Sequence, residues 1–148
     1  MKELSFGMKT VLALAALAAG SAMYAQGGKA VTSHDGSCQV TVPADWNVTE
    51  AFGMAESPDK TMSAVTSSPK LTPMLSGLKQ NAPTIYTNDK ITKDTPTVFQ
   101  MEGESMNGKP NVYRGIQIAG KVCIVEVQYS SGTIDDARKI AESLKSAK

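Results

Sequence analysis

The chain of 148 residues has little of what catalysis and metal binding usually need. It contains one histidine, two cysteines and one tryptophan, and aromatic residues make up 5% of it. A Ser–His–Asp or Cys–His unit needs a histidine held by a fixed scaffold, whereas His34 lies in a Gly- and Ser-rich stretch. A zinc site needs close pairs of ligands, which these residues do not provide. We therefore expect no such catalytic unit, no metal and no cofactor.

An excess of charge of one sign is also missing. The chain has 15 basic and 14 acidic residues, of which Lys2, Lys9 and Glu3 lie in the first 25 positions. The remainder therefore has a formal net charge of zero. Nucleic acids and anionic membranes are bound by concentrated positive charge, so we expect neither as a partner. Five dispersed methionines after residue 25 are expected to fill the core rather than bind soft metals: Met54, Met62, Met74, Met101 and Met106.

The N-terminus has the pattern of an export signal. Two lysines precede the apolar run Val11–Ala19, and small residues follow it. The run is shorter than a membrane-spanning helix, and no cysteine follows it to carry a lipid. We predict a signal peptide over residues 1–25, cleaved after Ala25 or alternatively after Ala22. The protein is then periplasmic or secreted, with no integral membrane span, although a retained membrane anchor is the other interpretation.

The two cysteines predict a disulfide bond. Both follow the predicted signal, and an even number in an oxidising compartment favours pairing. Cys38 alternates with Val40 and Val42 on one face of a strand pattern, and Cys123 shares a face with Val125 in a second strand pattern. Both thiols are thus expected to point into one interior. We predict a Cys38–Cys123 bridge, with two buried free thiols as the alternative.

The rest of the pattern predicts one α+β domain over residues 37–148, after a flexible lead-in over residues 26–36. Alternation of apolar and polar residues predicts a set of strands. They are expected near 38–42, 46–52, 61–67, 97–105, 110–119 and 122–129, with a further edge strand possible within 84–95.

Two helices complete the predicted fold. Thr72 and Pro73 give a helix-start signal for a helix over about 72–81 that ends before Pro83. Thr133 caps a closing amphipathic helix over about 133–146. The predicted fold class is therefore α+β, with a single antiparallel sheet flanked by helices.

Two segments carry a resemblance to a known family. "CQVTVPADWNV" at 38–48 and "GKVCIVEVQYSSGTIDDARKIAESLK" at 120–145 resemble the opening and the end of Mog1/PsbP-like proteins. The likeness spans most of residues 36–146. It implies a binding or adaptor protein, since members assist photosystem II, bind a small GTPase or act as chaperone-like adaptors in bacteria. The matching features are a turn, a tryptophan and a helix, so no catalytic residue is carried over.

A few side chains remain as candidates for function. Trp46 is expected to anchor the sheet in the core, or, if exposed, to contact a partner. Glu102 and Glu104 share one strand face, and Glu126 is expected near them. Paired carboxylates can run glycosidic chemistry, although solvated carboxylates are the commoner case. Arg114, on the neighbouring strand, is a candidate partner for Glu102.

The leading expectation for function is an exported, non-enzymatic binding or adaptor module that docks another envelope or secreted protein. One alternative is a structural protein of the cell envelope that assembles as a homo-oligomer through an exposed sheet edge. The other is a small hydrolase that uses the sheet carboxylates.

Overall fold

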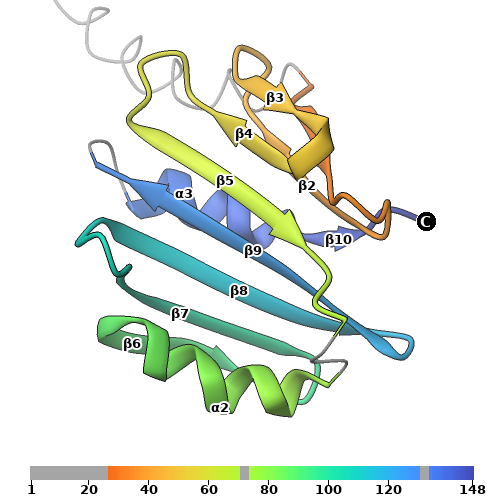
Figure 1. Ribbon diagram of the computed structural model, residues 1–148, viewed down its shortest axis with the longest axis vertical. Coiled ribbons are helices and arrows are strands. Elements are labelled where there is room, and N and C mark those ends of the chain that lie inside the picture. Colours follow the sequence, from red (N-terminus) through yellow and green to blue (C-terminus); the bar gives the residue numbers. More distant parts are fainter. Residues whose placement is uncertain (1–26, 71–73, 131–133) are drawn as a thin grey trace, which may run out of the picture.

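The computed structural model describes residues 27–70, 74–130 and 134–148. Within them the chain forms ten strands in two sheets, which are antiparallel throughout (Figure 1). The strands are β1 (Lys29–Thr32), β2 (Cys38–Val42), β3 (Asn47–Thr49), β4 (Met54–Glu56), β5 (Met62–Ser67), β6 (Thr87–Asp94), β7 (Val98–Glu104), β8 (Pro110–Ile118), β9 (Lys121–Tyr129) and β10 (Lys145–Ser146). The helices are α2 (Leu75–Ile85), α3 (Ile134–Glu142) and the 3-10 turn η1 (Glu50–Phe52). None of the helices in these segments is both long and apolar enough to span a membrane.

This architecture corrects the predicted fold class. The protein is mostly β, with a seven-stranded sheet in the order β3-β4-β5-β9-β8-β7-β6 and a three-stranded sheet in the order β1-β2-β10. The expected single sheet flanked by helices is wrong, because β1 and β10 both pair with β2 and form a separate small sheet. The segment predicted as a flexible lead-in forms β1, whose Val31 is fully buried. The expected last turn of the closing helix is instead β10.

The two helices differ from their predicted bounds. Helix α2 continues through Pro83 to Ile85. Proline is unfavourable in a helix interior, but the apolar face of Leu75, Leu78 and Ala82 is buried here and holds the last turn in place. Helix α3 ends at Glu142, four residues earlier than expected, and β10 follows. The start signals at 72–73 and the cap at 133 lie outside the described residues.

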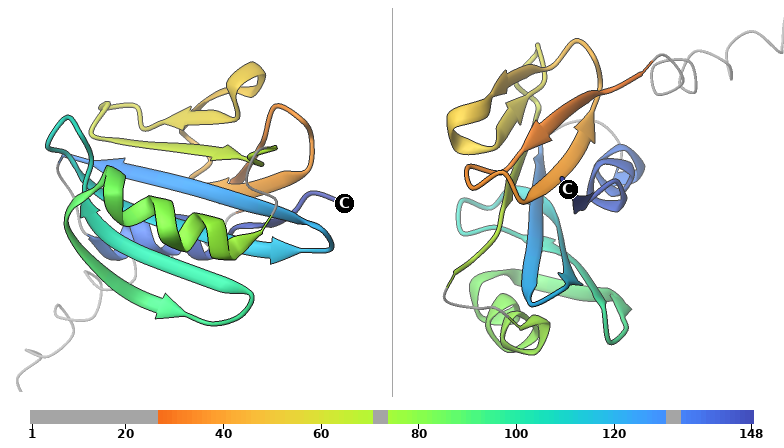
Figure 2. Two further views of the ribbon diagram at one scale, coloured as in Figure 1. Left: turned by 60° about the horizontal axis from the view of Figure 1, so that its bottom comes forward. Right: turned by 90° about the vertical axis from the view of Figure 1, so that its right-hand side faces the viewer.

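One face of the seven-stranded sheet is covered over its centre. Helix α3 packs against β8 and β9, and the three-stranded sheet lies beside it over β5 and β9 (Figure 2). Trp46, which is 4% exposed, packs in the same core as Ala55 and Val127. It is therefore an anchor of the core and is not available for a partner.

The other face is covered only in part. Helix α2 packs over β6, β7 and β8, where its side chains meet Phe99, Met101, Tyr113 and Val122. Gly115 allows this close approach, because a Cβ there would lie 3.1 Å from Leu75 Cδ1. Figure 1 shows that, among the described elements, none lies in front of β5 on this face.

The predicted disulfide is confirmed. Cys38 in β2 is bonded to Cys123 in β9, with a Cα–Cα distance of 5.6 Å. Both residues are fully buried. The bond therefore joins the small sheet to the large one across the main core.

Three hairpin turns share one pattern of side-chain hydrogen bonds. Each has a serine, then Asp or Asn two residues later, and the serine hydroxyl donates a hydrogen bond to that side chain. The same Asp or Asn oxygen accepts a backbone N–H two residues further on, at 3.1 Å in all three turns. The fourth residue of each turn has a positive φ. The turns are Ser33–Ser37, Ser57–Thr61 and Ser105–Lys109.

Removing the disulfide should destabilise the fold. Replacing both cysteines with alanine frees a loop of 85 residues, so we expect the free energy of unfolding to fall by about 3–4 kcal/mol. The midpoint of thermal unfolding, measured by circular dichroism, should fall by on the order of 10 °C. An unchanged midpoint in wild-type protein whose two thiols are shown by mass spectrometry to be reduced and alkylated would contradict this.

The aspartates of the turns should contribute to acid unfolding. Hydrogen bonds from Ser33 lower the pKa of Asp35 below its ordinary value near 3.8, and hydrogen bonds from Ser57 do the same for Asp59. Their stabilisation is thus present above about pH 3.8 and is lost as the pH falls through the lower folded-state pKa.

The third turn already uses Asn107, so asparagine is compatible with this geometry. We expect the double variant Asp35→Asn, Asp59→Asn to keep its fold at pH 7, and its free energy of unfolding to fall less than that of wild type between about pH 5 and pH 2, because the amides do not titrate. Urea unfolding at several pH values, followed by the fluorescence of Trp46, measures this, and an equal or larger fall in the variant would contradict it.

Candidate functional site

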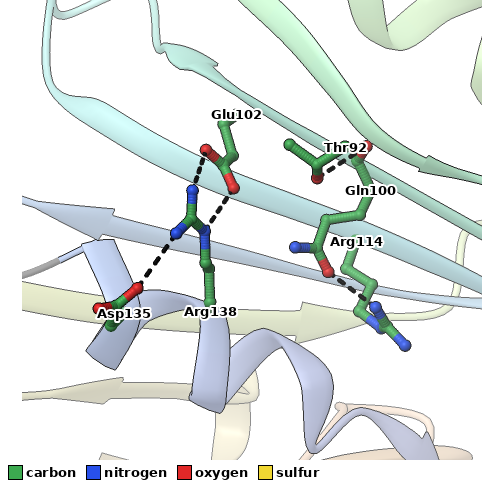
Figure 3. A network of polar contacts seen from close by, with 6 residues as sticks. All are labelled: Thr92, Gln100, Glu102, Arg114, Asp135 and Arg138. Atoms are coloured by element: carbon green, nitrogen blue, oxygen red, sulfur yellow. Dashed lines mark hydrogen bonds and ion pairs between the residues drawn. The ribbon is translucent and has the colours of Figure 1, made fainter.

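The structure places Glu102 in a structural ion pair. Its two carboxylate oxygens accept hydrogen bonds from Arg138 Nε at 2.6 Å and Nη2 at 2.9 Å (Figure 3). Arg138 also donates a hydrogen bond to Asp135 at 3.1 Å. The contacts with Glu102 raise the pKa of the Arg138 guanidinium above its ordinary value. The pair joins β7 to α3. Both oxygens of Glu102 are occupied, so this carboxylate is not set up as an acid or a base.

The other predicted carboxylate contacts do not form. Arg114 lies opposite Gln100 in the β7–β8 register, and its Nη1 donates to Gln100 Oε1 at 2.7 Å (Figure 3). Arg114 is therefore not the partner of Glu102. Glu126 lies opposite Tyr113 on β8, whose side chain points to the α2 face. Glu126 is thus on the opposite face of the sheet from Glu102 and Glu104, and the expected cluster is wrong.

The remaining candidates also have local roles. His34 is exposed, and its Nδ1 lies 3.0 Å from the carbonyl oxygen of Ala51, so it links the β1–β2 turn to η1. Met101 is buried in the core under α2, whereas Met106 is 90% exposed. Throughout the described segments, no three His, Cys, Asp or Glu side chains are grouped so that they could hold a metal ion.

The structure instead reveals a groove that runs along one side of α2. It consists of two adjoining hollows with volumes of about 220 and 310 Å³, which share Ile85 and Tyr86. We call the pair the α2 groove. The first hollow is lined mainly by apolar and aromatic side chains, which include Pro69, Leu78, Ala82, Tyr113 and Ile124. The second hollow has a mixed lining of Ser105, Met106, Asn107, Glu126 and Gln128.

Glu126 is the chemical centre of the α2 groove. Its carboxylate accepts hydrogen bonds from Tyr86 Oη, Asn111 Nδ2 and Gln128 Nε2, each at 2.9 Å. Each of these donors is neutral. No lysine or arginine in the described residues forms an ion pair with it. Glu126 is therefore a half-buried carboxylate held in place without a counter-charge.

Two tyrosines pack beside this carboxylate. The ring centroids of Tyr86 and Tyr113 are 5.5 Å apart and the planes are tilted by 48°. Burial raises the pKa of both phenols above the ordinary value, and the charge of Glu126 raises it further. Both tyrosines stay protonated at physiological pH, so Tyr86 acts as a hydrogen-bond donor that orients Glu126 rather than as a base or a nucleophile.

Sequence reasoning missed the α2 groove for a physical reason. Glu126 and Gln128 occupy the polar positions of a strand whose apolar positions define the core, and such positions are normally solvated. Tyr86 lies between a helix and an edge strand, where no periodicity assigns its direction. Asn111 and Tyr113 alternate with apolar residues in β8. An amide and an aromatic side chain on the face opposite the predicted core are unusual, so this alternation could have indicated that the second face of the sheet is also partly buried.

Comparison with known proteins supports the fold alone. No protein-family model matches the chain, and no curated protein matches it. A crystal structure at 1.50 Å resolution of a protein from Bacteroides thetaiotaomicron VPI-5482 is similar, with a TM-score of 0.51 and 16% sequence identity. The similarity covers 83% of this chain and 49% of that chain, so the chain spans about half the length of that protein. These comparisons do not assign the chain to the Mog1/PsbP-like family.

Neutralising Glu126 should shift the titration of the two tyrosines. In Glu126→Gln the negative charge that disfavours the phenolates is gone, so we expect the pKa values of Tyr86 and Tyr113 to move down toward the ordinary value of 10.0. The 13Cζ chemical shifts of labelled tyrosines against pH measure each phenol separately. Tyr129, whose pKa is raised mainly by burial, serves as an internal control. An equal shift of all three would contradict the assignment.

Proposed function

We propose that this protein is an exported, non-enzymatic binding module that docks another exported protein through the α2 groove. The observation that carries the proposal is the partly uncovered face of the large sheet. Along the α2 groove, Ile85 is 51% exposed and Met106 is 90% exposed, and Val65 on the neighbouring part of the face is 39% exposed. Exposed apolar side chains gathered at a groove are typical of protein contact sites.

The size of the hollows favours a protein partner over a small molecule. Pockets for small ligands usually have volumes of about 300–1,000 Å³ and enclose most of the ligand. The two hollows, of about 220 and 310 Å³, lie at or below the lower limit and are lined in part by exposed residues. They suit single side chains of a docked polypeptide.

The chemistry of the α2 groove favours binding over catalysis. General acid–base catalysis requires a group that can exchange a proton with the substrate near the working pH. Tyr86 and Tyr113 have raised pKa values, and Glu126 is held in a fixed orientation by three neutral donors. Export is supported by the N-terminal sequence pattern and by the disulfide, which persists in oxidising compartments.

A matched pair of isoleucine variants tests the proposal. Ile85 and Ile91 are 51% and 49% exposed, but only Ile85 lines the α2 groove. We expect Ile85→Arg to reduce the yield of a cross-linked partner at least about tenfold, because a charge there opposes apolar docking, and Ile91→Arg to leave the yield unchanged. The measurement is cross-linking of the tagged protein in its native envelope, followed by mass spectrometry.

Two controls make the result interpretable. Circular dichroism must show that both variants keep the wild-type fold. Equal partner yields from the two variants would refute docking at the α2 groove, and cross-links only between copies of this chain would favour the self-assembling alternative.

A further inference from the structure

The charge and shape of the α2 groove specify what kind of segment docks in it, an inference that rests on the proposed function. We infer that the partner supplies an extended segment that places a lysine or arginine side chain against Glu126. An apolar side chain two residues away then fills the first hollow. Three features of the α2 groove support this.

The first feature is charge. Glu126 is the one charged side chain among the described residues that line the two hollows. It is half-buried and has no ion pair with a described residue. A carboxylate in such surroundings is stabilised by an approaching cation, which gains more there than at a fully solvated site.

The second feature is the kind of hydrogen bonding that is left over. The three donors around Glu126 leave part of its acceptor capacity unused, since a carboxylate offers about four acceptor positions. Asn111 is 2% exposed, and its Oδ1 is an acceptor without a partner in the described segments. The hydrogen-bonding positions left unused at and beside the carboxylate are therefore all acceptors. They suit a lysine or arginine side chain, which carries only donors. The ring of Tyr86 lines the same hollow and can contact the cation.

The third feature is spacing. The two hollows share Ile85 and Tyr86 as a common wall, so they are neighbours along one side of α2. In an extended segment, side chains two residues apart point to the same side and are about 7 Å apart. One extended segment can therefore place its basic side chain in the second hollow and an apolar side chain in the first.

Short peptides of defined sequence test this inference on the purified protein. The probe is Ac-Ser-Leu-Ser-Arg-Ser-Leu-Ser-NH2, which has leucine two residues from arginine in both directions, so either orientation is allowed. The comparison peptides replace the arginine with glutamate, or both leucines with serine. Binding is measured from NMR chemical-shift changes of the labelled protein as each peptide is added.

We expect the arginine peptide to shift the resonances of Tyr86, Tyr113 and Glu126 and to bind at least about tenfold more tightly than the other two peptides. In Glu126→Gln its affinity should fall about tenfold, and the preference for arginine over glutamate should disappear. Glu56→Gln is the matched control, because Glu56 lies on the same face of the sheet but lines neither hollow. The affinity of Glu56→Gln for the arginine peptide should equal that of wild type.

Equal binding of the arginine and glutamate peptides, a preference that survives Glu126→Gln, or no binding of any peptide would overturn the inference. These failures differ from failure of the docking proposal itself. If Ile85→Arg loses the cross-linked partner while the peptides show no preference for arginine, the docking surface stands and the basic segment is wrong. If Ile85→Arg keeps its partner, the surface is wrong.

Discussion

The central strands of the large sheet have apolar side chains on both faces, and both faces therefore need cover. On β8 and β9, Val112 and Val125 point to the face under α3 and the small sheet, whereas Tyr113 and Val122 point to the face under α2. Helix α2 has 11 residues, so it is about 16 Å long and lies over the β6–β8 side of the sheet. The α2 groove lies at the edge of the area of the sheet that α2 covers. The arrangement of the core thus sets the position of the candidate site.

Two glutamates on opposite faces show how the same side chain takes different roles. Glu102 is paired with the guanidinium of Arg138, and this pair fixes α3 to β7. Glu126 is held by neutral donors from α2's C-terminal side, from β8 and from β9. Glu102 thus forms an ion pair with an arginine of the same domain, whereas Glu126 has no ion pair among the described residues. This difference in pairing, added to the partly uncovered face, supports the proposed docking at the α2 groove.

Much of the local structure could be read from the sequence. The alternation in 97–129 predicted β7, β8 and β9, and an edge strand does form within 84–95 as β6. The shared inward direction of Cys38 and Cys123 allowed their bridge to be predicted. The errors came where pairing between distant segments overrode local signals, as when the Gly- and Ser-rich lead-in became β1 against β2. The α2 groove could not be found in this way, because the contact between Tyr86 and Glu126 depends on how α2 lies on the sheet, which local alternation does not encode.

Period-two patterns were sufficient to identify most of the strands and to say which side chains of each strand share a face, because these properties depend on residues next to one another in the chain. How many sheets form, which face is left uncovered and which carboxylate finds an arginine depend on contacts between segments far apart. Arg138 is 36 positions from Glu102, and Ser143, whose hydroxyl oxygen accepts a hydrogen bond from the backbone N–H of Thr41 in β2, is 102 positions from Thr41. Such contacts have no signature in local periodicity. They form only when the elements pack together, so the candidate site emerges with the tertiary structure.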